Sequence, residues 1–274
     1  MKSSNTYKIF IYTALPCEAK AFIEHYKLKK DLEAHAFAVY VNNDICLAVT
    51  GLGKSAIAAA VAYTQARYTS TEHPVLVNIG IAGHQHYPLG ELFLIDKISD
   101  VDSQKSYYPA LITKSPCRRA SLQTVSKPQL QYHASELCDM EASAFYETAV
   151  RFTSSELIVC LKVISDNQDS SVEAINAKQV SALIAAHLLI IEALLIQTRA
   201  LANLITTPVP QLFNELLQRY HLTVHQRQQL KNHLSRWDVL TDQQSLLPID
   251  SNLMNGKDLL HWLDSRINAL NFNL

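Results

Sequence analysis

The chain has 274 residues, 48% hydrophobic and 18% charged, which is enough apolar material for one substantial core or one core with an appendage. Its 24 Lys and Arg residues nearly balance 25 Asp and Glu, and the formal net charge of -1 excludes a strong global field that would attract a polyanion. We therefore expect a small polar ligand rather than nucleic acid or a membrane surface.

The first 205 residues alternate strand-like and helix-like segments, which is typical of an α/β domain. Apolar, β-branched runs predict strands at 7–14, 45–50, 74–80, 90–98 and 156–165. Helices are predicted at 56–67, 139–152 and from 171 to about 201. Residues 103–135 are polar and contain three prolines, so they predict loops and short irregular strands near a site.

Two apolar stretches need an assignment other than a leader or a membrane span. The stretch from Ile9 to Cys17 is too short for a signal segment and predicts an internal strand. The tract from Ala182 to Ile196 is shorter than the roughly 20 residues of a membrane span, and it predicts a buried helix. The five cysteines are widely spaced without a CxxC pair, which indicates reduced thiols and a cytoplasmic protein.

Residues 206–274 predict an all-helical extension, because strand-like runs stop there. Apolar side chains recur at helical spacing in two stretches, first Leu212, Leu216, Leu217 and Tyr220, then Leu230 and Leu234. A helix-turn-helix reading fits the short connection between these stretches, but no Lys/Arg-rich recognition face accompanies it. We favour packing or dimer formation over DNA binding.

Three acidic residues occur where a solvated charge would be unusual. Glu18 follows the first strand, Glu141 opens a helix and Asp166 ends a buried strand. Each alone is more often a helix cap or a salt bridge. However, the carboxyl ends of parallel strands converge on one crevice, and glycines such as Gly80 and Gly83 let the backbone approach a ligand there. Together these residues predict a site.

Six short segments occur in a particular order: Ala14-Leu15-Pro16-Cys17-Glu18, Gly51-Leu52-Gly53-Lys54, Asn78-Ile79-Gly80-Ile81-Ala82-Gly83, Gly90-Glu91-Leu92, Asp139-Met140-Glu141-Ala142 and Ile164-Ser165-Asp166. In order and approximate spacing they resemble the motifs of methylthioadenosine/adenosylhomocysteine nucleosidases and their phosphorylase relatives. The resemblance covers about the first 195 residues. It implies a three-layer α/β/α phosphorylase-type domain with a mixed central sheet over residues 1–205, a homodimer, and no metal or organic cofactor.

The resemblance also implies roles for single residues. Asp166 matches the acid that protonates N7 of the purine, with Ser165 holding it, and Glu18 matches the general base that takes a proton from water. Glu141 matches the residue that grips the ribose hydroxyls, and Met140 the side chain that packs against the sugar. The remaining predicted binding positions are Gly80, Ile81, Gly83 and Lys162. These roles suit the chemistry, because N-ribosidic cleavage builds positive charge on the sugar and negative charge on the base.

The surroundings of the second glycine turn favour water over phosphate as the nucleophile. Lys54 is nucleosidase-like, no arginine lies nearby, and Glu18 would repel phosphate. We therefore expect hydrolysis of an adenosine-type purine nucleoside, including 5′-modified ones such as methylthioadenosine or 5′-deoxyadenosine. Two alternatives stay open: a phosphate-dependent purine nucleoside phosphorylase, and a non-catalytic nucleoside-binding module. The second is compatible with two departures from the family pattern, Ile81 in place of a small or polar residue and Lys162 in place of arginine.

Other candidate features carry less weight. Tyr107 and Tyr108 are candidates for stacking on the base, although aromatic residues in loops more often serve packing. The pair His84 and His86 lacks a third metal ligand nearby and indicates a polar loop. The segment from Ser121 to Ser126 lacks the glycine usual in the family's base-binding loop.

Overall fold

The computed structural model describes residues 6–112, 114–129, 135–170, 175–205, 209–242, 244–250 and 253–270. The chain divides into two compact units, Met1–Thr206 and Thr207–Leu274. The first unit contains two hydrophobic core clusters, and the second unit contains one separate cluster.

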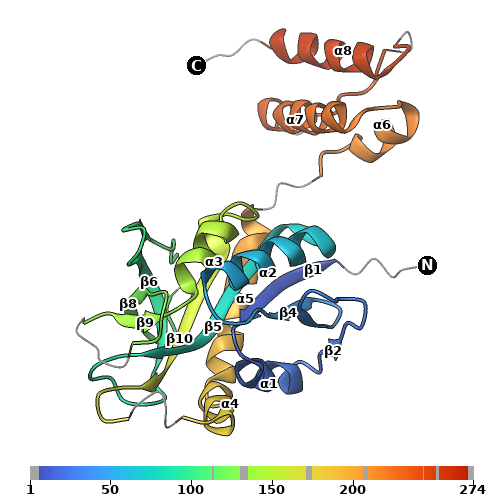
Figure 1. Cartoon of the computed structure of the whole chain (residues 1–274). Helices are drawn as coiled ribbons and strands as arrows, with labels where there is room; N and C mark the ends of the chain where they lie inside the picture. The colour runs from blue at the N-terminus through green and yellow to red at the C-terminus, as the bar shows by residue number, and fades with distance from the viewer. Residues whose placement is uncertain are drawn as a thin grey trace. The chain divides into compact units, whose positions relative to one another are not determined.

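A mixed sheet forms the centre of the first unit (Figure 1). Strand β1 (Tyr7–Thr13) lies between β4 (Ile45–Val49) and β5 (Ser70–Gly83) and is parallel to both. Strand β10 (Ile158–Asp166) pairs in parallel with the other side of β5. Because both faces of these central strands are covered, their sequences are almost continuously apolar.

The remaining strands extend the sheet on both sides. Beyond β4, the antiparallel strands β3 (Ala38–Val41) and β2 (Lys29–Lys30) form the edge. Beyond β10 follow β6 (Leu92–Asp100), β8 (Arg118–Thr124) and β9 (Leu137–Asp139), in that order. The short strand β7 (Ser106–Tyr107) pairs with β6. Strand β9 returns to β5 through the pair Gly83 and Cys138. This part of the sheet therefore closes on itself and brings the ends of β5, β9 and β10 together.

Side chains alternate between the two faces of the sheet, and helices cover each face. Phe10 and Tyr12 of β1 face one core cluster, whereas Ile9 and Ile11 face the other. The first cluster also contains side chains of α2 (Lys54–Arg67) and α3 (Ala142–Ala149). The second contains side chains of α1, α4 and α5, which span Pro16–His25, Ala177–Ala185 and Leu188–Ile205 (Figure 1). The expected three-layer α/β/α architecture with a C-terminal helical region is confirmed.

The second unit is helical in the part that the structure describes. It contains α6 (Phe213–Arg219), α7 (Val224–Leu240) and α8 (Gly256–Asn268). The side chains of Thr223 and Asn255 accept hydrogen bonds from backbone N–H groups in the first turns of α7 and α8, which fixes where these helices begin. The predicted spacing reappears in the core of this unit, which is built on Leu216, Leu230, Leu234, Trp237, Leu259 and Leu263.

The single long helix predicted from residue 171 is wrong, because two helices, α4 and α5, occupy this region. The chain turns at Ala186 and His187, where the His187 ring Nε2 lies 2.6 Å from the carbonyl oxygen of Gly90. This contact with the loop before β6 holds the break. The predicted start at 171–174 lies outside the described residues.

Helix α5 is buried on one side only, which corrects the expectation of a buried helix. Ile191, Leu194 and Leu195 pack in the core, whereas Leu189 and Leu204 are 77% and 82% exposed. Among the described residues it is the one helix long and apolar enough to cross a membrane. That is weak evidence for a span, since core helices of globular proteins pass the same test.

Two further boundaries differ from expectation. Residues 118–124 form the regular strand β8, because β6 and β9 supply pairing partners on both sides of a polar segment. The helix expected from Asp139 begins at Ala142, because residues 137–139 belong to β9. The carboxylate of Asp139 accepts the Ala142 N–H at 2.9 Å, so it holds the start of the helix from outside.

Candidate active site

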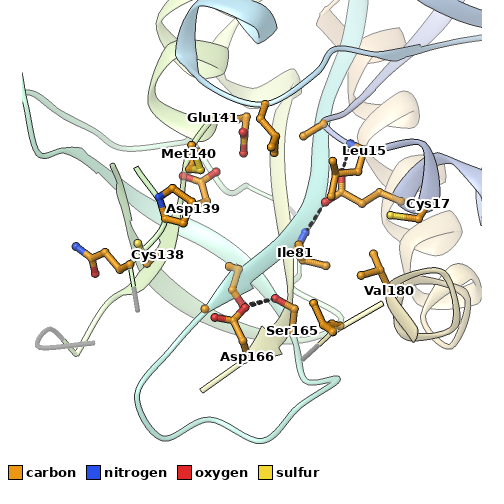
Figure 2. A pocket seen from close by; sticks show the side chains of 18 of the residues that line it. Leu15, Cys17, Ile81, Cys138, Asp139, Met140, Glu141, Ser165, Asp166 and Val180 are labelled. Carbon is orange, nitrogen blue, oxygen red and sulfur yellow. Dashed lines mark hydrogen bonds between the residues drawn. The ribbon is translucent and has the colours of Figure 1, made fainter. Parts of the chain in front are cut away.

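A cavity of about 410 Å³ lies at the carboxyl ends of β5, β9 and β10, beside the start of α1 (Figure 2). Its volume is in the range of small-molecule sites. Seven of the nine predicted site residues line it: Glu18, Ile81, Gly83, Met140, Glu141, Ser165 and Asp166. The three acids that are far apart in the sequence therefore meet around one cavity.

Glu18 is buried and held by two backbone donors. Its Oε2 accepts the Leu15 N–H at 2.8 Å, and its Oε1 accepts the Ile81 N–H at 2.9 Å. The first bond caps α1, which Pro16 begins. Burial raises the pKa of Glu18 despite these bonds. The residue is thus both a helix cap and a carboxyl group with an increased proton affinity in the cavity.

Gly80 does not line the cavity but makes room for Glu18. A Cβ at this position would lie 2.8 Å from Glu18 Oε1, closer than such contacts occur. The absence of a side chain at Gly80 therefore lets the Glu18 carboxylate reach the backbone N–H of Ile81.

Glu141 precedes α3 as its N-cap and reaches across to the glycine turn. Its Oε1 accepts the Gly53 N–H at 2.8 Å, and Gly53 has a φ of 96°, a conformation that favours glycine. Burial and the neighbouring Asp139 raise the pKa of Glu141 to about 7. A pKa near 7 leaves this carboxyl group only partly ionised near neutral pH.

The raised pKa of Glu141 gives a testable dependence of stability on pH. The folded protein binds this proton more tightly than the unfolded chain does, so the stabilisation is complete below about pH 4.5 and is lost as the pH rises through about 7. The loss is on the order of 3 kcal/mol. We expect Glu141→Gln, which mimics the protonated acid, to flatten this part of the curve when the free energy of unfolding is measured by urea titration at several pH values. An unchanged slope in the variant would contradict the assignment.

Asp166 ends β10 and is fixed from two sides. The Ser165 hydroxyl donates a hydrogen bond to Asp166 Oδ1, and the His84 N–H donates to the Asp166 carbonyl oxygen at 3.1 Å. Both Ser165 and Asp166 are buried. Figure 2 shows the Asp166 and Glu141 side chains on different sides of the same cavity. This separation suits two acids that act on different parts of one ligand.

His84 organises the loop after β5. Its Nδ1 accepts the N–H groups of His86 and Tyr87, each at 3.0 Å, and its ring stacks on Tyr87 with centroids 3.8 Å apart. The described residues contain no group of three or more His, Cys, Asp or Glu side chains that could hold a metal ion.

Lys162 does not line the cavity either. It is buried in β10, and its Nζ lies 2.8 Å from Oδ2 of Asp139, which does line the cavity. Burial lowers the pKa of Lys162, but the nearby Asp139 and Glu141 carboxylates raise it above its usual value. The ammonium group is therefore a fixed positive charge beside the acids of the cavity.

Lys54, which follows the glycine turn, is already paired. Its Nζ lies 2.6 Å from Asp100 Oδ2 and 2.7 Å from Asp102 Oδ2. Burial raises the pKa of Asp100, but hydrogen bonds from Lys54 and Ser143 hold it well below its usual range. Lys54 thus joins the glycine turn to the end of β6.

Several lining residues were not predicted. Cys17, Leu52, Cys138 and Val180 supply apolar surface, and Val180 comes from α4. The signal available for Val180 was its position four residues after Asn176, a favourable N-cap residue inside the long helix predicted from residue 171. Tyr107 and Tyr108 are not among the described lining residues; Tyr107 packs against Tyr146.

The fold is similar to that of solved 5′-methylthioadenosine and S-adenosylhomocysteine nucleosidases over 69% to 72% of the chain. No family model and no curated protein matches the chain.

The similar solved structures include 5′-methylthioadenosine nucleosidase from Arabidopsis thaliana in apo form, at 15% identity and a TM-score of 0.56, covering 72% of this chain and 96% of that one. The nucleosidase for 5′-methylthioadenosine and S-adenosylhomocysteine from Helicobacter pylori, with butyl-thio-DADMe-Immucillin-A, matches at 12% identity and a TM-score of 0.55. The match covers 70% of this chain and 99% of that one. An Asp-to-Asn variant of MTAN from Chlamydia trachomatis, bound to MTA, matches at 17% identity and a TM-score of 0.54. The match covers 69% of this chain and 100% of that one. These likenesses establish the fold.

Proposed function

We propose that residues 1–205 form a nucleosidase domain that hydrolyses the N-ribosidic bond of a purine nucleoside and releases the free base. The observation that carries this proposal is the meeting of Glu18, Glu141 and Asp166 around one cavity of nucleoside size. Two of the similar structures contain MTA and butyl-thio-DADMe-Immucillin-A, which supports an adenosine-type nucleoside with a modified 5′ position. The expected homodimer and cytoplasmic location belong to the same proposal.

The reaction assigns one task to each acid. Asp166, in its protonated form and held by Ser165, donates a proton to N7 of the purine as the bond from C1′ to N9 breaks. Glu18 takes a proton from the attacking water, whose oxygen bonds to C1′. Glu141 accepts hydrogen bonds from the ribose hydroxyls, and Met140 packs against the sugar. Positive charge that develops on the ribose is thus matched by carboxylates.

Water rather than phosphate is favoured as the nucleophile because the donors around the cavity are already occupied. The N–H groups of Leu15 and Ile81 bind Glu18, and that of Gly53 binds Glu141. Lys54 is engaged by two aspartates, and the described lining contains no Lys or Arg. A phosphate dianion needs several donors, and here it would meet carboxylates.

The test is to incubate the purified protein with a panel of purine nucleosides, with and without phosphate, and to measure free base by chromatography. We expect base release at the same rate in both conditions, with ribose rather than ribose 1-phosphate as the second product. A strict requirement for phosphate would assign a phosphorylase instead. Nucleoside binding without any release would assign a binding module.

A further inference from the structure

Lys162 is a cation buried completely within the domain. It lies in the middle of β10, where Gly80 of β5 and Phe93 of β6 are its neighbours in the sheet. Its side chain and that of Asp139 are each 1% exposed, and the Nζ to Oδ2 distance is 2.8 Å. Removing two charges from water is costly even when they pair, so stabilisation of the fold alone does not account for this buried pair.

Asp139 has donors enough without the lysine. Its Oδ1 accepts the Thr124 hydroxyl at 2.8 Å, and its Oδ2 accepts the Ala142 N–H at 2.9 Å. These two bonds already fix the carboxylate between β8, β9 and α3. Fixing Asp139 therefore does not by itself explain a buried ammonium group at this position.

The sheet register places Lys162 beside the acids of the cavity. Lys162 pairs with Gly80, and a Cβ at Gly80 would lie 2.8 Å from Glu18 Oε1. Burial raises the pKa of Glu18 and of Glu141, and the Lys162 charge opposes this rise at both residues. Of the groups close to Lys162, Glu18 comes from α1, Asp139 from β9, and Glu141 from the segment before α3. Cys160 on the same strand stays a thiol, because burial raises its pKa to about 12. One positive charge thus faces three carboxyl groups.

We propose that Lys162 is a positioning residue for the hydrolytic base: its ammonium group, anchored by Asp139, keeps the buried Glu18 as a carboxylate that can accept a proton from water. This role rests on the proposed function. Burial favours the protonated form of Glu18, and the ammonium charge joins the backbone N–H groups of Leu15 and Ile81 in favouring the carboxylate. Loss of the cation shifts the balance toward the protonated form of Glu18, which cannot accept a proton from water.

The test compares the pH dependence of kcat/KM in three variants whose folding is checked by thermal melting. In Lys162→Met, we expect the acidic limb to move to higher pH by about one unit or more, with about tenfold lower kcat/KM below it and recovery above it. Lys162→Arg keeps the charge and leaves the limb near its wild-type position. Asp139→Asn removes a negative charge and leaves the ammonium, so the limb moves to lower pH.

A merely structural salt bridge predicts a different pattern. Lys162→Met and Asp139→Asn would then lose activity to the same extent at every pH, with no movement of the limb, and that result would overturn the proposal. If Lys162→Met does not fold, the opposite shift in Asp139→Asn and the unchanged limb in Lys162→Arg still decide the question.

A second measurement does not depend on turnover. Infrared absorption of the protonated carboxyl C=O stretch, with Glu18→Gln to assign the band, follows the titration of Glu18 directly. We expect this band to persist to higher pH in Lys162→Met than in the wild type and to disappear at lower pH in Asp139→Asn. Base release with an unmoved limb and band would leave the nucleosidase assignment intact and refute the role of Lys162. A shifted band without base release would support the effect of Lys162 on Glu18 and refute the nucleosidase assignment.

Discussion

Replacing Asp166 with Asn is expected to lower the rate of base release by about 10²- to 10⁴-fold, which is the usual contribution of a general acid. The purine leaves as an anion unless N7 receives a proton, and an amide in this position cannot supply one. Because Asn keeps the size of Asp and can still accept the Ser165 hydroxyl, the cavity should stay intact.

Two measurements check this result. Single-turnover kinetics should show the loss in the chemical step, and calorimetric titration with the nucleoside should show a dissociation constant within a few-fold of the wild type. Asp169→Asn, an exposed aspartate three residues further along the chain, is the matched control and should be fully active. Undiminished turnover in Asp166→Asn would contradict the role of this residue.

Replacing Glu18 with Gln is expected to reduce hydrolysis by a similar factor, about 10²- to 10⁴-fold, for a different reason. The variant lacks a base for the attacking water. In addition, both oxygens of Glu18 face N–H donors, so the NH₂ group of Gln must oppose one of them. We therefore expect lower stability as well as lower activity.

The two effects can be separated by measuring the melting temperature alongside the steady-state rate with an adenosine-type nucleoside. Glu24→Gln, an exposed glutamate on the same helix, is the matched control and should change neither quantity appreciably. If Glu18→Gln melts at a lower temperature but turns over like the wild type, Glu18 is only a cap for α1. The general base must then be sought elsewhere.

Much of the fold could be predicted from sequence because its signals are local. The apolar runs at 7–14 and 74–80 became β1 and β5, and the glycine turn before residue 56 became the start of α2. Strand β8 could not be predicted in the same way. Its sequence, Arg118 to Thr124, is mostly polar, and its strand structure depends on pairing with β6 and β9. The turn at His187 likewise depends on a distant carbonyl group.

The site shows the same division. The acids at strand ends were expected to converge, and Glu18, Glu141 and Asp166 do line one cavity. From the sequence, a helix cap and a catalytic group were competing interpretations of Glu18. In the structure the same carboxylate caps α1 and also lines the cavity. Lys162 was expected to contact the substrate, but it does not line the cavity. It pairs with Asp139, and the sequence does not show this pairing because the two residues lie on different strands.

The most direct test of the nucleoside site is a crystal structure of the protein with bound adenine. We expect the base in the cavity with N7 at hydrogen-bond distance, about 2.7–3.2 Å, from the Asp166 carboxyl group, and with the space beside Glu18 and Glu141 left for the ribose. Adenine bound outside this cavity, or inside it with N7 directed away from Asp166, would contradict the assignment of the three acids.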